Sequence, residues 1–369
     1  MKLLLLSVSA GAGHVRAAQA LEEAARRLHP AADVRHEDVL DFTAKAYRKA
    51  YAGSFLAMVN HAPQLWGYLY RATDAEKVRK VPQKFVTFFD RLEFSSFRKF
   101  VRAFAPDAIL STHFLPAQVL APSRKKGKDT YPLGLVVTDF DVHSYWVQPT
   151  ADRVFVGSGE LKARLAERGI PEEKVSVTGI PIAKAFSEKW DRAAIQQRLG
   201  LSANLPTVLV MSGGGGVGSM GEAVEDVLAC PRVQVLAVTG RNEALRNDLA
   251  SLPVPEGSKL HVFGFVDPIA ELMAVSDLAV TKSGGLTTSE CLAMGLPMVV
   301  RDPIPGQEER NCDYVLESGA GVKAYGNASL AWKLQTLLPD RERLSRMSEA
   351  ARRAGRPGAA WEIVATKLR

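Results

Sequence analysis

The sequence contains few cysteines and no long apolar run, and each shortage excludes a class of protein. Its 369 residues include only three cysteines, Cys230, Cys291 and Cys312. An odd number at separations of 61 and 21 residues suits neither a disulfide framework nor a zinc site, so we expect reduced packing residues in a cytosolic protein. No stretch approaches the roughly 18 uninterrupted apolar residues that a membrane-spanning helix requires. We therefore expect a chain that does not cross a bilayer.

Short apolar runs alternate with helical patterns, which is typical of parallel sheets built from βα units. The predicted strands are KLLLLSV, DAILST, LGLVVTD and RVFVGS in the first half, and TVLVMSG, VQVLAVTG, LHVFGF, DLAVTK and PMVVRD in the second. Each half opens with a strand, a glycine loop and a helix. The length also fits two domains of roughly 150 to 200 residues. We expect an α/β protein with two Rossmann-like domains facing each other, residues 1–184 and 185–354. A final helix within about 355–369 would pack back on the first domain.

The opening stretch LLLLSVSAGAGHVRAAQAL, residues 3–21, imitates a signal peptide, because Lys2 precedes an apolar run and small residues follow it. Apolar residues then recur at gaps of three and four from Val15 to Leu28. The glycines therefore lead directly into an amphipathic helix, which cleavage would separate from its strand. We expect this segment to remain part of the folded protein.

The same stretch resembles a dinucleotide-binding loop but departs from it at one position. Three residues after Gly13, where that fingerprint needs a small residue, the sequence has Arg16. What remains is a loop that can approach a ligand closely, with His14 at a helix N-terminus. The helix dipole disfavours an imidazolium there, so His14 can be a general base. The alternative is an ordinary histidine at a helix start.

Two further glycine loops follow strands of the second half. In MSGGGGVGSM, residues 211–220, the backbone amides of Ser212, Gly213, Gly214 and Gly215 can bind a phosphate, although no G-K-[ST] follows and a mobile linker is the alternative. In TKSGGLTTSECLAMGLP, residues 281–297, the amides of Ser283, Gly284 and Gly285 can bind a second phosphate. Both loops indicate a diphosphate ligand.

Acidic and amide side chains near two helix starts can bind sugar hydroxyls. Glu290 can hold the two hydroxyls of a ribose, but Thr287 and Glu290 also have the spacing of a capping box. In DPIPGQEERN, residues 302–311, Gln307 and Glu308 suit the hydroxyls of a hexose, although acids are common in the first turn of any helix.

A pair of aspartates stands in VVTDFDVHSYW, residues 136–146. Asp139 and Asp141 have the D-x-D spacing of metal-dependent sugar transferases, which is a weak signal for a single pair. His113, in STHFLP, and His143 are better explained as pocket or core residues than as metal ligands. We expect no bound metal.

The segment from residue 45 to residue 104 is basic and aromatic. It holds twelve Lys and Arg residues against four Asp and Glu residues, a local charge of +8 in a chain of net charge +7, and 13 of the 28 aromatic residues. Such a mixture is typical of helices on anionic lipid. It also fits single-stranded nucleic acid, or two ordinary amphipathic helices with cationic solvent faces.

Eight segments together resemble a known family. The segments are SAGAGHVRAA, STHFLP, TDFDVHSYWV, VFVGS, VTGIPI, SGGGGVGSM, KSGGLTTSECLAMGLPMV and PIPGQEERN. In order and along nearly the whole chain, they are similar to the monogalactosyldiacylglycerol synthases and bacterial processive diacylglycerol glycosyltransferases. They resemble more distantly the bacterial enzyme that adds N-acetylglucosamine to lipid I. The resemblance implies a GT-B fold, with the acceptor on the N-terminal domain and a UDP-sugar on the C-terminal domain.

The resemblance also implies residue roles. It implies that His14 is the base, that Glu290 holds the ribose and that Gln307 with Glu308 holds the hexose. The chemistry allows His14 to take the acceptor's proton directly or through Asp139. Phe265 and Val266, in FGFVD, match the turn that reads the uracil. The glycine loops would bind the diphosphate. The predicted acceptor residues are Gly13, His113, His143 and Trp146.

The implied reaction is inverting transfer of glucose or galactose from a UDP-sugar to diacylglycerol, without metal or cofactor, to give a β-linked glycolipid. The basic segment would dock on the anionic cytoplasmic face of the plasma membrane and bind no nucleic acid. Two alternatives remain open: transfer to another lipid or cell-wall acceptor, and a nucleotide-binding module at a membrane that performs no transfer. The sequence leaves open the donor sugar, the number of sugars added and the oligomeric state.

Overall fold

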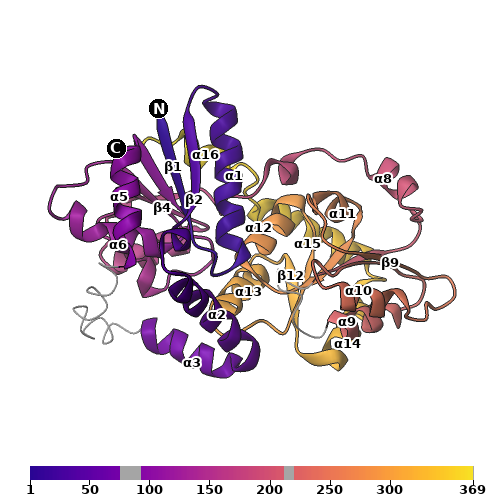
Figure 1. Cartoon of the computed structure of the whole chain (residues 1–369). Coiled ribbons are helices and arrows are strands. Elements are labelled where there is room, and N and C mark those ends of the chain that lie inside the picture. The colour runs from indigo at the N-terminus through magenta and orange to yellow at the C-terminus, as the bar shows by residue number, and fades with distance from the viewer. Residues whose placement is uncertain (75–92, 212–219, 369) are drawn as a thin grey trace. The chain divides into compact units, whose positions relative to one another are not determined.

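The computed structural model describes residues 1–74, 93–211 and 220–368 (Figure 1). The chain folds into two compact units. Unit 1 comprises Met1–Lys184, Ile304–Gln307 and Gly358–Arg369, and unit 2 comprises Ala185–Pro303 and Glu308–Pro357. Each unit has one six-stranded, all-parallel sheet. The predicted α/β class with two Rossmann-like domains is confirmed.

The sheet of unit 1 has the strand order β2-β1-β3-β4-β5-β6. Its strands are β1 (Lys2–Ser7), β2 (Asp33–Asp38), β3 (Ala108–Ser111), β4 (Leu133–Val136), β5 (Arg153–Val156) and β6 (Val175–Val177). Its helices are α1 (Ala12–Leu28), α2 (Lys45–His61), α3 (Pro63–Asp74), α5 (Ser95–Phe104), α6 (Phe114–Arg124), α7 (Gly159–Glu167) and α16 (Ala359–Ala365).

Burial on both faces of this sheet explains the continuous apolar run of β1. Alternate side chains of a strand point to opposite faces. Leu4 and Leu6 accordingly join one buried cluster, and Leu3 and Leu5 join another together with α1 and α16. In Figure 1 α16, from the end of the chain, lies beside α1 of the beginning. The C-terminal helix therefore contributes to the core of unit 1.

The sheet of unit 2 has the order β12-β11-β10-β7-β8-β9. Its strands are β7 (Thr207–Met211), β8 (Gln234–Val238), β9 (Lys259–Phe263), β10 (Leu278–Thr281), β11 (Met298–Arg301) and β12 (Gly321–Ala324). Its helices are α8 (Arg192–Arg198), α9 (Met220–Leu228), α10 (Glu243–Ala250), α11 (Ala270–Val275), α12 (Gly285–Met294), α13 (Gln307–Glu317), α14 (Gly326–Leu337) and α15 (Arg341–Ala354).

The sequence patterns predict nine of these strands but not β2, β6 and β12, all of which lie at sheet edges. β2 has the polar sequence DVRHED, and β6 is only three residues long. The three cysteines are buried and form no disulfide. Within the described ranges, no helix combines the length and apolar character needed to span a bilayer.

Candidate functional site

His14 lies in the first turn of α1, immediately after the loop that leaves β1. The cap of this helix is Gly11, in extended backbone and without a side-chain hydrogen bond. The Nδ1 atom of His14 is 2.8 Å from the carbonyl oxygen of Thr112 and 3.0 Å from Oγ1 of Thr138. The hydroxyl of Thr112 in turn donates to the carbonyl oxygen of His14 at 2.8 Å. The ends of β3 and β4 therefore fix the ring.

These contacts determine the tautomer of His14. A carbonyl oxygen only accepts, so Nδ1 carries the proton and Nε2 carries the lone pair. Burial lowers the pKa of His14 to about 4, partly offset by the hydrogen bond to Thr112. Burial thus favours the neutral ring that the position at a helix N-terminus also predicts. The ring is neutral at physiological pH, and its basic nitrogen has no hydrogen-bond partner among the described residues.

His113 is held in the opposite tautomer beside it. It caps α6, and its Nδ1 accepts the backbone N–H of Leu115 at 3.0 Å, so its Nε2 carries the proton. Its pKa lies well below the ordinary value because the ring is buried, and the neighbouring His14 lowers it further. The two rings meet edge to face with centroids 4.6 Å apart. One ring offers a lone pair and the other an N–H group.

Aromatic side chains surround this histidine pair. The ring of Trp146 is 6.4 Å from that of His14 and 6.3 Å from that of His113, between centroids. Phe114 is 4.1 Å from His113 by the same measure. Three residues predicted to act on the acceptor side, His14, His113 and Trp146, are thus brought together in unit 1. Phe114 is a member that the sequence analysis did not single out, although it stands in the quoted motif STHFLP.

Asp141 is engaged in protein contacts that leave the D-x-D pair unsuited to a metal. Its buried carboxylate accepts the Tyr70 hydroxyl at 2.7 Å and forms an ion pair with Arg164, also at 2.7 Å. Across the described part of the chain, no three His, Cys, Asp or Glu residues lie where they could hold a metal ion.

Asp139 follows Thr138, whose hydroxyl contacts the ring of His14. Nδ1 of His14 makes this contact as well as the one with the carbonyl oxygen of Thr112. The charge of Asp139 also helps to raise the pKa of Tyr70, and burial is the largest cause of that rise. The relay of the proton through Asp139 stays a prediction.

His143 lies next to the histidine pair rather than in it. It caps the short helix Ser144–Trp146 by accepting the N–H of Tyr145, and its Nε2 donates to the carbonyl oxygen of Tyr70 at 3.0 Å. Its ring stacks near those of Tyr70 and Tyr145, each with centroids 4.6 Å away. Gly13, also predicted for the acceptor side, is the second residue of α1.

In unit 2, the loop Ser283–Gly285 leads from β10 into α12. Gly284 caps the helix without a side-chain hydrogen bond, so the first backbone amides of α12 have no side-chain cap. The buried Ser283 donates its hydroxyl to the carbonyl oxygen of Glu308 at 2.7 Å. This bond ties the loop to the start of α13, where Gln307 and Glu308 are the first two residues. The other predicted phosphate loop, Ser212 to Gly215, lies outside the described residues.

Glu290 lies inside α12 and is 8% exposed. The capping-box alternative is wrong, because the cap is Gly284 and Thr287 is the third residue of the helix. The side chain of Phe265, predicted for the uracil, is 56% exposed in the turn after β9, with Val266 half-buried beside it. The guanidinium of Arg241 lies 5.6 Å from the ring centroid of Phe265, a partner that the sequence analysis missed.

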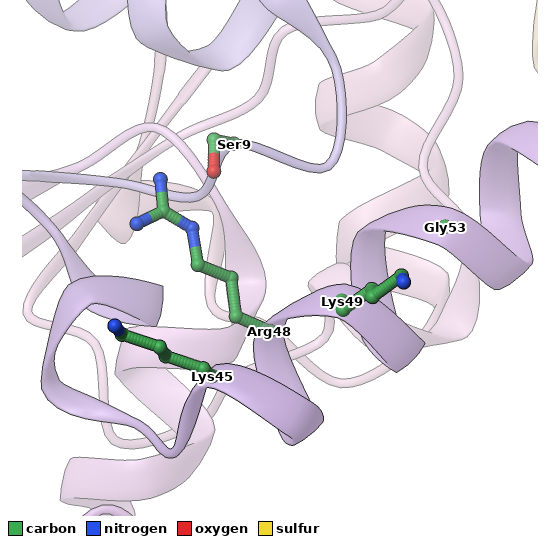
Figure 2. Close-up of a pocket in the computed structure, with 5 residues that line it drawn as sticks. All are labelled: Ser9, Lys45, Arg48, Lys49 and Gly53. Atoms are coloured by element: carbon green, nitrogen blue, oxygen red, sulfur yellow. The ribbon is translucent and has the colours of Figure 1, made fainter.

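A basic pocket of about 430 Å³ lies where α2 meets the loop after β1. Figure 2 shows its lining residues, Ser9, Lys45, Arg48, Lys49 and Gly53. Arg48 forms ion pairs with Asp38 and Asp41. Lys45 and Lys49 are exposed and one helical turn apart. The pocket therefore presents positive charge beside Ser9, which stands five residues before His14 in the sequence.

The chain matches two family models, one in each half. Residues 14–182 match monogalactosyldiacylglycerol (MGDG) synthase, and residues 207–363 match the glycosyltransferase family 28 C-terminal domain. A processive diacylglycerol beta-glucosyltransferase of Bacillus cereus (strain AH187) is 31% identical over 376 residues, which cover 100% of this chain and 93% of that protein. A protein of the same description from Bacillus mycoides (strain KBAB4) has the same identity and coverage. The chain belongs to the diacylglycerol glycosyltransferase family.

The glycosyltransferase also shares its fold with solved structures. MurG of Acinetobacter baumannii matches with a TM-score of 0.64 at 15% identity, covering 98% of this chain and 97% of that one. Anabaena Alr3699/HepE in complex with UDP matches with a TM-score of 0.60 at 17% identity, covering 99% and 98%. The GT-B fold predicted from the sequence is confirmed.

Proposed function

We propose that this glycosyltransferase moves a hexose from a UDP-sugar to diacylglycerol and inverts the anomeric carbon. The observation that carries the proposal is His14, a neutral histidine with its Nε2 lone pair available inside an aromatic cluster of unit 1. Glucose is the first donor to test, because the Bacillus relatives are described as diacylglycerol beta-glucosyltransferases. The product is a β-glycosyldiacylglycerol.

The chemical step is a single displacement. The acceptor oxygen forms a bond to the anomeric carbon while the bond from that carbon to the UDP oxygen breaks. The attacking hydroxyl becomes strongly acidic as its oxygen gains positive character, so even a base with a pKa of about 4 can take its proton. Nε2 of His14 receives the proton, and the N–H of His113 is placed to orient the hydroxyl.

UDP leaves with developing negative charge. We propose that backbone amides, rather than a metal, stabilise this charge. The uncapped start of α12 provides N–H groups and the positive end of a helix dipole. The loop 212–215 is proposed to do the same. Glu290 would hold the ribose diol, Phe265 and Val266 the uracil, and Gln307 with Glu308 the hexose. No cofactor enters this scheme.

The proposed location is the cytoplasmic face of the membrane, where the protein binds anionic lipid peripherally. α2 and its pocket carry the exposed Lys45 and Lys49 (Figure 2), and α3 exposes the apolar side chains of Leu65 and Tyr68. Cations beside exposed aromatic and apolar side chains fit the interface of an anionic bilayer. The remainder of the basic segment includes residues 75–92, which lie outside the described residues.

The test is to incubate the protein with diacylglycerol vesicles and each UDP-sugar separately, and to read the lipids by mass spectrometry. We expect one added hexose with UDP-glucose, and further hexoses if the enzyme is processive. Tight UDP binding without any lipid product would favour a nucleotide-binding module. UDP release that requires another lipid would favour a different acceptor.

A further inference from the structure

Helix α3 is fastened to the loop 141–146, which follows the end of β4. The Tyr70 hydroxyl donates to Oδ2 of Asp141 at 2.7 Å, and Oδ1 of Asp74 accepts the backbone N–H of Ser144, also at 2.7 Å. The hydroxyl of Ser144 donates to the carbonyl oxygen of Thr73 at 2.9 Å. Two residues of the loop, Asp141 and Ser144, are thus joined by three hydrogen bonds to the last two turns of one helix about 70 residues earlier in the chain.

Two arginines near the end of α7 complete this junction. Arg168 donates to both carboxylate oxygens of Asp74, at 2.7 and 3.0 Å, and to the carbonyl oxygen of Val142 at 2.7 Å. Arg164 pairs with Asp141. Each carboxylate therefore has two kinds of partner. Asp74 of α3 bonds the loop and Arg168, and Asp141 of the loop bonds α3 and Arg164. Charge-assisted bonds of this kind are about twice as strong as neutral ones.

The loop leads by ring contacts from α3 to the proposed base. The ring of Tyr145 lies 4.6 Å from that of His143 and 5.1 Å from that of Phe114, and Trp146 lies 6.4 Å from His14, all between centroids. A shift of α3 that moved the loop would therefore move the aromatic side chains that surround His14, because packed rings transmit displacement.

The other face of α3 is exposed. Leu65 is 52% exposed and Tyr68 64%, and Arg71 is exposed on the same helix. Apolar side chains with a neighbouring cation fit a lipid surface, and the acceptor proposed above resides in one. α3 thus has one set of side chains for the membrane and another, Tyr70 and Asp74, for the loop.

We infer that Tyr70 and Asp74 are positioning residues that couple the seating of α3 on a lipid surface to the arrangement of the loop 141–146 beside His14. The inference rests on the proposed function in one respect, namely that the acceptor is drawn from a lipid surface. Neither residue is assigned a contact with substrate. Loss of the coupling lowers the use of diacylglycerol in vesicles and leaves the donor side of the enzyme unchanged.

The first experiment uses Tyr70→Phe, which removes the hydroxyl but keeps the ring beside His143, with the exposed Tyr325→Phe of unit 2 as its matched control. Asp141 keeps its pair with Arg164, so the fold should survive, and thermal unfolding checks this. We expect kcat/KM for vesicle diacylglycerol to fall roughly tenfold in Tyr70→Phe, with UDP affinity unchanged. Transfer to a dispersed short-chain diacylglycerol should fall less. Equal losses on both acceptors, or no loss, would overturn the inference.

The second experiment does not depend on sugar transfer. Hydrogen exchange of the peptide covering residues 141–146 is followed with and without vesicles of anionic phospholipid and diacylglycerol. We expect vesicles to increase protection in the wild type and in Tyr325→Phe, but not in Tyr70→Phe or Asp74→Asn. A loop that is indifferent to vesicles in the wild type would refute the coupling even if the enzyme proves active. A response to vesicles without any glycolipid product would instead refute the proposed function alone.

Discussion

His14 is half-buried and His113 is buried, and their neighbours hold the two rings in complementary tautomers. Thr112 accepts the Nδ1 proton of His14, and Leu115 donates to Nδ1 of His113. Neither bond involves a residue that an isolated motif would suggest as catalytic. The chemistry of the site therefore depends on backbone groups at the end of β3 and the start of α6.

We expect His14→Gln to abolish transfer while UDP binding stays nearly intact, because glutamine has similar reach but cannot accept a full proton. A general base contributes about 10² to 10⁴-fold, so the loss should appear in turnover. The matched control is His29→Gln, at the exposed C-terminal end of the same helix. If His14→Gln keeps more than about a tenth of the wild-type rate, His14 is only a residue of the helix start.

The pKa of His14 predicts the acid limb of the pH profile. Because burial lowers this pKa to about 4, the base stays deprotonated through the range where an ordinary histidine is protonated. The profile of kcat/KM should therefore bend near pH 4, since it reports the free enzyme. A bend near pH 6.5 would show that the ring is solvated and ordinary.

The same shift predicts how stability depends on pH. The folded state binds its proton near pH 4 and the unfolded state near pH 6.5, so the free energy of unfolding falls as pH falls between these values. The full difference is worth about 3 kcal/mol. His14→Gln should lose less stability than the wild type on acidification, as measured by urea unfolding at several pH values. Identical pH dependence in both proteins would contradict the shift.

Glu290→Ala should weaken UDP binding by on the order of 10 to 100-fold, because a charge-assisted contact with the ribose diol is lost. Titration calorimetry measures this directly, with the exposed Glu349→Ala on α15 as control. A normal UDP affinity combined with a lower melting temperature would assign Glu290 a structural role inside α12.

At the scale of elements, α2 presents its cations where the loop after β1 begins. Replacing both Lys45 and Lys49 by alanine should weaken binding to anionic vesicles by about 2 kcal/mol, or roughly 30-fold, at low salt. The control is Lys125→Ala with Lys126→Ala, two exposed lysines after α6. Cosedimentation with neutral and anionic vesicles measures the effect, and equal binding of both vesicles by the wild type would remove the electrostatic basis of docking.

The sequence predicts the buried elements well and the edges poorly. Continuous apolar runs such as that of β1 identify strands covered on both faces, whereas the edge strand β2 is polar and shows no such run. His14 could be singled out because it follows a glycine loop. The hydrogen bond from Tyr70 to Asp141 could not be predicted, because it joins residues 71 positions apart and depends on how α3 packs. The spacing of Thr287 and Glu290 likewise fits a capping box in the sequence. Only the structure shows that α12 begins at Gly285 and that these residues do not form one.

At the scale of the whole molecule, the two units contain different parts of the proposed reaction. The proposed base and its aromatic surroundings belong to unit 1, and the loop Ser283–Gly285 with Glu290 belongs to unit 2. Substitutions in the first unit should therefore change turnover and the use of acceptor, and those in the second should change donor affinity. The full-length similarity to diacylglycerol glycosyltransferases is consistent with both parts acting in one enzyme.

The anomeric configuration of the product tests the central claim most directly. The protein is incubated with UDP-glucose and diacylglycerol vesicles, and the purified glycolipid is analysed by proton NMR, with His14→Gln run in parallel. A single displacement assisted by His14 predicts a β-linked glucose from the α-linked donor and almost no product from the variant. An α-linked product, or a variant that makes the β-linked lipid at the wild-type rate, would contradict the account.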